Sequence, residues 1–207
     1  MSRLAINPTR MEMLKLKKRL KAAKHGHKLL KDKRDGLMKE FIQIIKEAKK
    51  LRKEVEPELQ TAFQEFLFAS AIGAPWKIEE ALLIPRKKIS LETRTKNVMG
   101  VNIPIFDYKE EDNFSSYSLI QTPADIDSAI KTFSKTLKKL VKLAQTEHSA
   151  KLLAFEIEKT RRRVNALEYI FIPNIQETIK YINAKLTEQE RNALVTLMKI
   201  KKELVLS

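Results

Sequence analysis

A seven-residue repeat of mainly apolar side chains between Met13 and Val55 constrains the fold of this chain more than any other sequence feature. The a positions of the repeat are Met13, Leu20, His27, Arg34, Phe41, Ala48 and Val55, and the d positions are Leu16, Ala23, Leu30, Leu37, Ile44 and Leu51. The spacing alternates between three and four residues over about six heptads, which is typical of a coiled coil. At 1.5 Å per residue this helix is roughly 65 Å long, so its narrow seam needs a long partner helix. Only the C-terminal third of the chain is long enough to supply that partner.

The composition favours a mostly helical protein in a reducing compartment. Only four glycines and 7% aromatic residues are present, and the hydrophobic content of 43% is ordinary. The absence of cysteine excludes disulfides, thiolate metal sites and cysteine nucleophiles. The sequence has neither the run of about 20 apolar residues that crosses a membrane nor an N-terminal apolar signal core. We therefore expect a cytoplasmic protein that does not insert directly into the membrane.

The first helix is predicted to begin close to residue 8 and to end before Gly73. Either Asn7 is the N-cap, or Thr9 is the N-cap and forms a capping box with Glu12. Pro57 lacks an amide donor and is predicted to kink or end the regular helix. Helical spacing of apolar residues resumes after it, so a helical continuation is expected.

The middle of the chain predicts a β-hairpin over about residues 87–106, preceded by a short helix at 76–83. Apolar residues or threonines alternate with polar ones on both sides of turn residues at 97–100. Pro104 marks the second strand as an edge, and two isolated strands are marginally stable, so the hairpin must pack on a helix or another subunit. The acidic and then serine-rich stretch at 108–121 is predicted as an exposed loop. The candidate functional residues of the hairpin are Ile89, Leu91, Asn97, Gly100, Val101 and Ile103.

A second long helix is predicted from residue 122, where Thr122-Pro123-Ala124-Asp125 supplies a cap and a first-turn proline. Its first heptad positions are Ile126, Ile130, Phe133, Leu137, Leu140 and Ala144. The pattern loosens between residues 147 and 163 and recovers from Val164 onward. The two long helices are expected to lie antiparallel, with both chain termini at one end and the hairpin insertion toward the other.

The predicted fold class is mainly α, a long antiparallel two-helix coiled coil with a short helix and a β-hairpin inserted in the middle. The expected domains are an N-terminal coiled-coil helix at 1–72, the insertion at 73–121 and a C-terminal coiled-coil helix at 122–207. The predicted coiled-coil seam contains Leu16, Leu20, Leu30, Leu37, Phe41, Ile44, Leu51, Leu137, Leu140, Leu167, Ile179 and Leu186.

Three features interrupt the helical repeats. Gly26 lies beside the seam, where it either lets another backbone approach closely or is a tolerated imperfection that costs about 1 kcal/mol relative to alanine. The three arginines at 161–163 are expected to interrupt the seam, either to dock a partner or to pair with Glu158. Pro173 predicts a kink rather than a helix end, because apolar periodicity resumes after it.

The motifs of catalysis are missing from the sequence. Gly26 and Gly36 are ten residues apart, which excludes the phosphate-cradling loop with glycines five residues apart. His25 and His27 diverge on a helix, and no paired carboxylates or nucleophile elbow occur. We therefore predict a non-enzymatic chain with no catalytic residue, no metal site and no cofactor.

The first helix carries many lysines and arginines between Arg10 and Arg34, within a chain of net charge +15. This run is consistent with a phosphate-binding helix, with a solvated helix, or with a basic shaft inside a complementary protein cavity. The run lacks aromatic residues that could stack on bases, and its cations surround the helix. The residues alone leave the three interpretations open.

Two stretches resemble the D subunit family of the V-type (archaeal/vacuolar-like) ATPases. One is Asn7–Leu20 (NPTRMEMLKLKKRL) with Gly26–Asp35 (GHKLLKDKRD), and the other is Glu158–Tyr169 (EKTRRRVNALEY), followed by Ile172-Pro173. Residues 97–101 (NVMGV) resemble the hairpin turn of that family. These segments cover the chain from end to end in the order of the family.

The resemblance implies a central-stalk rotor protein that couples ATP hydrolysis or synthesis to H⁺ or Na⁺ transport through a membrane ring. The implied partners are the F subunit of the stalk, the hexamer of A and B subunits, and a funnel-shaped subunit on the ring, with no nucleic acid. The chain would be peripheral to the membrane as part of this complex. The basic run would face the hexamer through Lys15, Lys18, Arg19, Lys21, Lys24 and Lys28. The alternative is a basic coiled-coil adaptor or nucleic-acid-binding protein.

Overall fold

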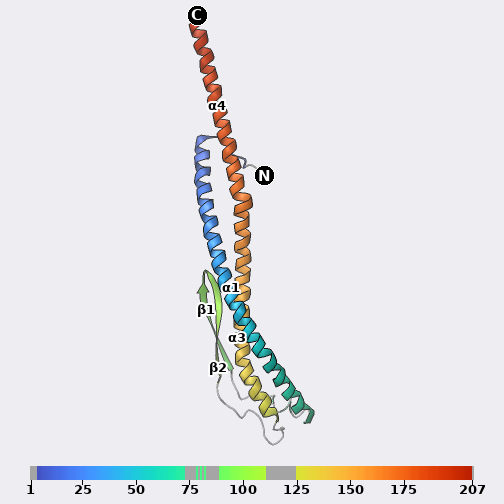
Figure 1. Cartoon of the computed structure of the whole chain (residues 1–207). Coiled ribbons are helices and arrows are strands. Elements are labelled where there is room, and N and C mark those ends of the chain that lie inside the picture. The colour runs from blue at the N-terminus through green and yellow to red at the C-terminus, as the bar shows by residue number, and fades with distance from the viewer. Residues whose placement is uncertain are drawn as a thin grey trace. The chain divides into compact units, whose positions relative to one another are not determined.

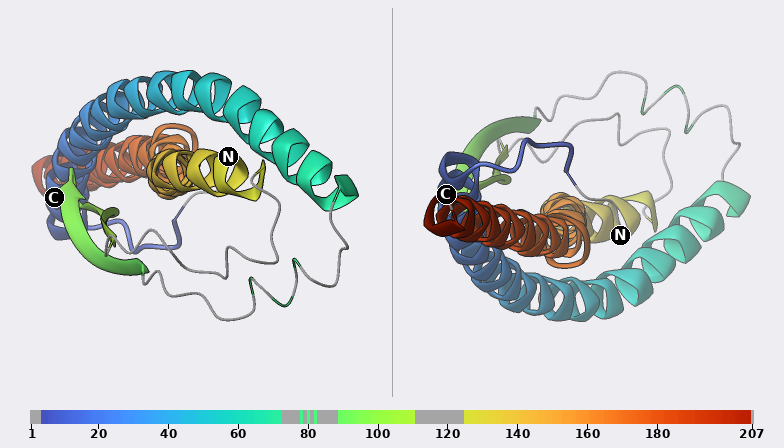
Figure 2. Two further views of the ribbon diagram at one scale, coloured as in Figure 1. Left: turned by 90° about the horizontal axis from the view of Figure 1, so that it is seen from below. Right: turned by 90° about the horizontal axis from the view of Figure 1, so that it is seen from above.

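The computed structural model of the chain describes residues 4–72, 78, 80, 82, 89–110 and 125–206. The elements are α1 (Arg10–Ile72), β1 (Ile89–Val98), β2 (Val101–Glu110), α3 (Asp125–Ala166), the π-helix η1 (Leu167–Phe171) and α4 (Ile172–Leu206). Each long helix is continuous in all views (Figure 1, Figure 2). The predicted fold class, long helices with a β-hairpin between them, is confirmed.

Three sequence predictions fall largely or wholly outside the described residues, one of them being the loop predicted at 108–121, of which only residues 108–110 are described. The predicted cap at 122–124 lies outside them, and so does most of the predicted short helix at 76–83. Within that helix Ile78, Glu80 and Leu82 are described, and all three are helical.

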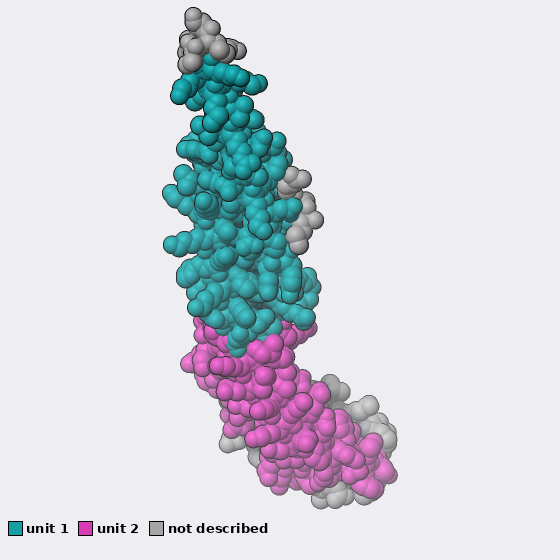
Figure 3. Space-filling view, turned by 45° about the horizontal axis from the view of Figure 1, so that its top comes forward, with its two compact units in different colours: residues 1–35, 157–207 teal, residues 36–156 magenta. Residues whose placement is uncertain are grey.

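The chain divides into two compact units, and α1 contributes to both (Figure 3). Unit 1 contains Met1–Asp35 and Ile157–Ser207, and unit 2 contains Gly36–Glu156. In unit 1, α1 packs against α4. The core of this pair is built from Leu16, Ile175 and Ile182, with Ile6, Met13, Leu20, Ile179 and Leu186 packed around it.

The helices of unit 1 run antiparallel. Arg10 forms an ion pair with Glu190, and His27 Nε2 lies 3.3 Å from Glu168 Oε2. As the residue numbers in α1 rise, the numbers of their partners in the C-terminal half of the chain therefore fall. The seam histidine is half-buried beside this carboxylate, so its neighbour is a polar group of the opposite helix.

In unit 2, α1 packs antiparallel against α3. Arg52 Nη2 lies 3.2 Å from Glu147 Oε1, and farther along α1 the Thr132 hydroxyl donates to Glu65 over 3.0 Å. An edge-to-face contact between Phe63 and Phe133 closes this part of the pair, with ring centroids 5.3 Å apart. A small core nearby contains Ala69, Ile78 and Ile126, with Phe66 and Ile130 packed against it.

The first turn of α1 and its internal proline are both accommodated locally. The Thr9 hydroxyl accepts a hydrogen bond of 3.2 Å from the Glu12 N–H, so Thr9 rather than Asn7 is the cap. The helix continues through Pro57, which is exposed. The carbonyl oxygen of Pro57 accepts a hydrogen bond of 3.0 Å from the Thr61 hydroxyl. The proline therefore does not end the helix.

Small and polar residues carry much of the buried seam. The heptad continues from Val55 to Ala62 and Ala69, which are completely buried. The described part of the chain buries five hydroxyl side chains, namely Thr136, Thr146, Ser149, Thr160 and Thr178. The hydroxyls of Thr136 and Thr178 donate to the carbonyl four residues earlier, over 2.8 and 2.7 Å. Such hydroxyls can be buried because their donor is satisfied within their own helix.

These hydroxyls explain why the pattern of the second helix loosens in the sequence. Between residues 147 and 163 the seam continues through Ser149, Leu153, Ile157 and Thr160, all of them buried. Earlier in α3, Ile126 is buried at its predicted position, but the next buried positions, Ala129, Thr136 and Leu143, each lie one residue before a predicted position, and Ala144 is exposed. An apolar pattern alone misplaces this face because Thr136 lies at its centre.

The arginines at 161–163 do not interrupt the seam, contrary to the sequence prediction. All three are exposed, and the seam passes them through Thr160 and Val164. Arg162 pairs with Glu158 one turn earlier, which is one of the two roles predicted for this run.

Pro173 is preceded by the π-helix η1 rather than by a helix break. Proline has no N–H for the carbonyl of Tyr169 four residues earlier. The Ile172 N–H instead donates to the Leu167 carbonyl five residues earlier, which widens this turn by one residue. The widened turn leaves Tyr169, Ile170 and Phe171 exposed by 69%, 61% and 46%.

The hairpin is longer than predicted. The strands pair antiparallel from Val98↔Val101 to Ile89↔Glu110, so residues 108–110, predicted as loop, belong to β2. The Phe106 N–H donates to Gln145 Oε1 at 3.0 Å, and the Ser134 hydroxyl donates to Glu110 at 2.9 Å. These bonds to α3 hold the end of β2, and such non-local support is not visible in the strand's own pattern.

Candidate interaction surfaces

The predicted seam residues lie at buried or half-buried positions. Leu16 and Leu37 are completely enclosed, with exposures of 1% and 0%. The half-buried members are Leu20, Leu30, Phe41, Ile44, Leu51, Leu137, Leu140, Leu167, Ile179 and Leu186. The predicted seam list leaves out the fully buried Leu153, and also Ile182, although Ile182 belongs to the apolar pattern that recovers from Val164 onward. The spacing of their apolar neighbours was the signal that could have found them.

The predicted basic surface is exposed throughout. Its members are Lys15, Lys18, Arg19, Lys21, Lys24 and Lys28. Lys15 Nζ lies 2.7 Å from Glu12 Oε1 one turn earlier. The remaining cations are available to carboxylates of another molecule or to water.

The C-terminal end of α4 presents apolar side chains without a helix beside them in the described part of unit 1. Arg10, the first residue of α1, pairs with Glu190, and α4 continues to Leu206 (Figure 1). Residues 187–202 are all exposed. The large apolar side chains here are Leu194 (56%), Val195 (51%), Leu197 (62%), Met198 (69%) and Ile200 (48%). We call residues 187–202 the α4 end; exposed apolar side chains gathered in this way are typical of an interaction site.

The hairpin has one packed strand and one exposed strand. Val101 and Ile103 on β2 are buried, with exposures of 9% and 8%. On β1, Ile89 and Leu91 are exposed by 47% and 49%. Asn97 shapes the turn, because its Oδ1 accepts the Gly100 N–H at 3.0 Å.

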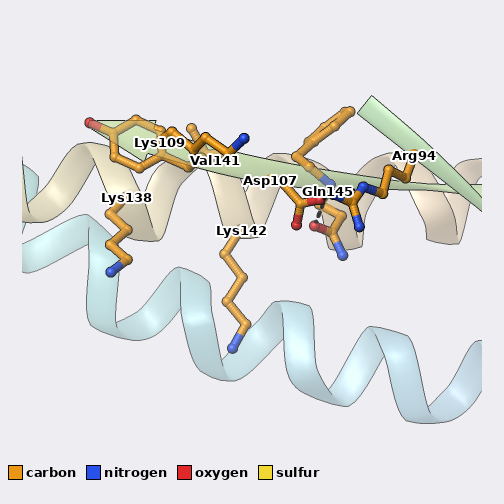
Figure 4. A pocket seen from close by; sticks show the side chains of 9 residues that line it. Arg94, Asp107, Lys109, Lys138, Val141, Lys142 and Gln145 are labelled. Atoms are coloured by element: carbon orange, nitrogen blue, oxygen red, sulfur yellow. Dashed lines mark hydrogen bonds and ion pairs between the residues drawn. The ribbon is translucent and has the colours of Figure 1, made fainter. Parts of the chain in front are cut away.

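A groove of about 550 Å³ separates β2 from α3 in unit 2 (Figure 4). Lys138 and Lys142 project from α3 on the same side, while Arg94 Nε pairs with Asp107 Oδ2 at 3.0 Å. The hydrogen bond of Lys109 with Glu92, and the negative charge of that carboxylate, raise the pKa of Lys109. The groove brings together cations and their counterions, and it contains no nucleophile–base arrangement.

Two kinds of feature do not occur among the described residues. Among them no three His, Cys, Asp or Glu side chains are grouped so that they could hold a metal ion. None of the described helices combines the length and apolarity needed to cross a membrane.

Comparison with known proteins decides the family. The sequence model of the family described as the D subunit of ATP synthase matches residues 12–202. The chain belongs to the ATP synthase D subunit family. The resemblance inferred from the two terminal signatures is thereby confirmed, and the chain is a non-catalytic subunit of a V-type ATP synthase.

Relatives in this family match the chain over nearly its full length. The V-type ATP synthase D subunit of Clostridioides difficile is 52% identical over 204 residues, covering 97% of this chain and 92% of the relative. That of Fusobacterium nucleatum is 50% identical over 207 residues, covering 99% of this chain and 98% of the relative. That of Clostridium botulinum is 50% identical over 204 residues, covering 96% of this chain and 94% of the relative.

Proposed function

We propose that this chain is the central-stalk rotor, or axle, of a V-type rotary ATPase. It couples ATP hydrolysis or synthesis in the hexamer of A and B subunits to H⁺ or Na⁺ transport through the membrane ring. The observation that carries this proposal is the α4 end, where a single helix with uncovered apolar side chains extends beyond the start of α1. Such a helix can enter a protein sleeve, where its apolar side chains would be buried.

The paired helices of unit 1 have the properties that an axle needs. The cluster in which Leu16 packs with Ile175 and Ile182 of the facing helix resists bending, because each of its side chains is held by the opposite helix. The exposed cations around α1 provide contact with the sleeve without deep pockets, since exposed ion pairs contribute only about 0–1 kcal/mol each. Contacts this weak allow the shaft to step between equivalent faces of a hexamer.

The remaining partners follow from the same role. The F subunit of the stalk and the funnel-shaped subunit on the ring would bind outside the part of the shaft that the hexamer surrounds. The chain would be peripheral to the membrane within the complex. We retain the division into helices at 1–72 and 122–207 with an insertion at 73–121 as a functional proposal, in which the helices carry torque and the insertion does not.

A disulfide lock tests the rotor role. The chain has no cysteine, so a single introduced cysteine at Leu197 is unique within it. It is oxidised to a second cysteine placed on the inner surface of one catalytic subunit of the assembled ATPase. We expect the lock to stop ATP hydrolysis and a reductant to restore it. Continued hydrolysis by the fully cross-linked complex would exclude rotation of this chain.

Neutralising four exposed cations should weaken seating in the hexamer. The variant carries glutamine at Lys15, Lys18, Arg19 and Lys21, and its helix content should not change. At about 0.5 kcal/mol per exposed pair, affinity for the hexamer should fall by about 2 kcal/mol, roughly thirtyfold. High salt should reduce wild-type binding similarly, because exposed charges are screened beyond about 8 Å at physiological ionic strength.

A matched variant controls for the loss of charge alone. It carries glutamine at four exposed lysines in the other unit's part of α1, namely Lys46, Lys49, Lys50 and Lys53. Titration of each variant with the hexamer separates the two positions. Equal losses in both variants would show that net charge, rather than the predicted basic surface, governs binding.

Replacing the hairpin should change turnover without preventing assembly. In this variant a short Gly-Ser linker replaces Ile89–Glu110. The long helices keep their mutual contacts, so binding to the F subunit and to the hexamer should persist. We expect ATP hydrolysis to slow while it stays coupled to rotation, because unit 2 loses the packing of Val101 and Ile103. A wild-type rate in the assembled complex would remove the modulatory role, and failed assembly would make the hairpin structural.

A further inference from the structure

The tip of the hairpin touches α1 at a position where only glycine leaves room. A Cβ built on Gly36 would lie 2.5 Å from Met99 Cε and 2.9 Å from Met99 Sδ. Carbon atoms in contact are normally about 3.5–4.0 Å apart. Met99 could therefore not keep its present position if residue 36 had a side chain. Gly26, ten residues earlier on the same helix, has no heavy atom within 4 Å of the equivalent point.

Met99 is an unexpected residue for the turn in which it lies. Met99 and Gly100 have φ values of 51° and 87°, both in the left-handed region. Two-residue hairpin turns of this kind favour asparagine or aspartate before glycine, because a longer side chain is disfavoured at positive φ. The turn therefore accepts a local cost that a shorter residue would avoid. A physical reason for methionine at position 99 is that its thioether reaches Gly36.

The rest of the hairpin is held along its length. Val101 and Ile103 are buried, and the Phe106 N–H is bonded to Gln145 on α3. The contact between Met99 and Gly36 lies at the opposite end of the hairpin from its connections to the helices. It is therefore the contact whose loss would free the tip first.

We propose that Met99 seated over Gly36 is a latch that holds the hairpin tip on α1, and that release of this latch is how the hairpin alters turnover. The second half of this statement rests on the proposed function of the hairpin in the rotary ATPase. The first half concerns the chain itself and is tested separately.

The latch is tested by comparing the same substitution at two glycines. Gly26→Ala and Gly36→Ala should each favour the folded helix by about fivefold, the typical effect of replacing glycine within a helix. They should differ in the hairpin. Gly36→Ala displaces the flexible end of Met99, a side chain that is 47% exposed, so amide exchange in the peptide covering residues 97–103 should accelerate by up to about fourfold, the factor for losing one fully buried methyl group. Gly26→Ala should leave that exchange unchanged.

A double substitution shows whether the two residues act together. Met99→Ala should accelerate exchange of the same peptide by a similar factor, and Gly36→Ala combined with Met99→Ala should add nothing further. Hydrogen-exchange mass spectrometry of the full chain provides all five measurements, wild type included. Unchanged hairpin exchange in Gly36→Ala, or additive effects in the double variant, would overturn the latch.

The role in turnover is measured in the assembled ATPase. Gly36→Ala should shift ATP hydrolysis in the same direction as replacement of the whole hairpin, and Gly26→Ala should not. Faster hairpin exchange with unchanged turnover would overturn the regulatory half of the proposal. Failure of the wild-type chain to bind the hexamer would instead contradict the rotor function, so the two failures are distinguishable.

Discussion

Leu37→Asp should lower the free energy of unfolding by at least about 4 kcal/mol. Leu37 is completely buried, and truncating a buried leucine to alanine alone costs about 2–5 kcal/mol. A carboxylate at this position adds the cost of removing a charge from water without a partner. Circular-dichroism melts of the full chain, alone and with the F subunit, measure the effect.

Two neighbouring leucines calibrate this prediction. Leu29→Asp changes a side chain that is 56% exposed, so it should alter stability by no more than about 0.5 kcal/mol. Leu30 is half-buried and should give an intermediate loss. If Leu37→Asp and Leu29→Asp had the same melting temperature, the heptad register assigned to α1 would be wrong.

Removing the apolar side chains of the α4 end should abolish tight seating in the hexamer. Leu197→Ser combined with Met198→Ser should leave the isolated chain as stable as wild type, because these side chains are exposed by 62% and 69%. Burying such side chains in a sleeve contributes about 1.5–3 kcal/mol each, so hexamer affinity should fall at least about a hundredfold. Titration of the reconstituted hexamer with each variant measures the loss.

The matched control lies on α1. Leu67→Ser combined with Phe68→Ser removes two apolar side chains exposed by 65% and 69%. That variant should retain hexamer affinity while the α4 end variant loses it. Equal affinity losses would mean that exposed apolar surface in general, rather than the α4 end, makes the contact.

The sequence predicts the fold well where apolar side chains carry the packing. The heptads from Met13 to Val55 place Leu16 and Leu37 at the centre of the seam, and both are completely buried. Prediction fails where small or hydroxyl residues carry it. Thr136 and Thr160 are polar by type, and only their place on the helix face makes them core residues.

The remaining differences have non-local causes. The end of β2 is bonded through Glu110 to Ser134, which is 24 residues away in the chain. The sequence alone does not single out the α4 end, because its apolar residues continue the pattern of a helix that already has a seam. What distinguishes them is that α1 begins at Arg10, opposite Glu190, and this requires the alignment of two distant segments.

The π-helix η1 also determines in which direction the α4 end faces. One extra residue in a turn advances every later side chain by about 100° around the helix axis. Ile175 and Ile182 lie in the seam only after that rotation, so η1 sets which side of α4 faces α1. The same advance fixes the azimuth of Leu194 and Leu197 around α4. A shortening of η1 by one residue would therefore turn the whole of α4, so this single widened turn aligns both the seam between α4 and α1 and the exposed apolar side chains of the α4 end.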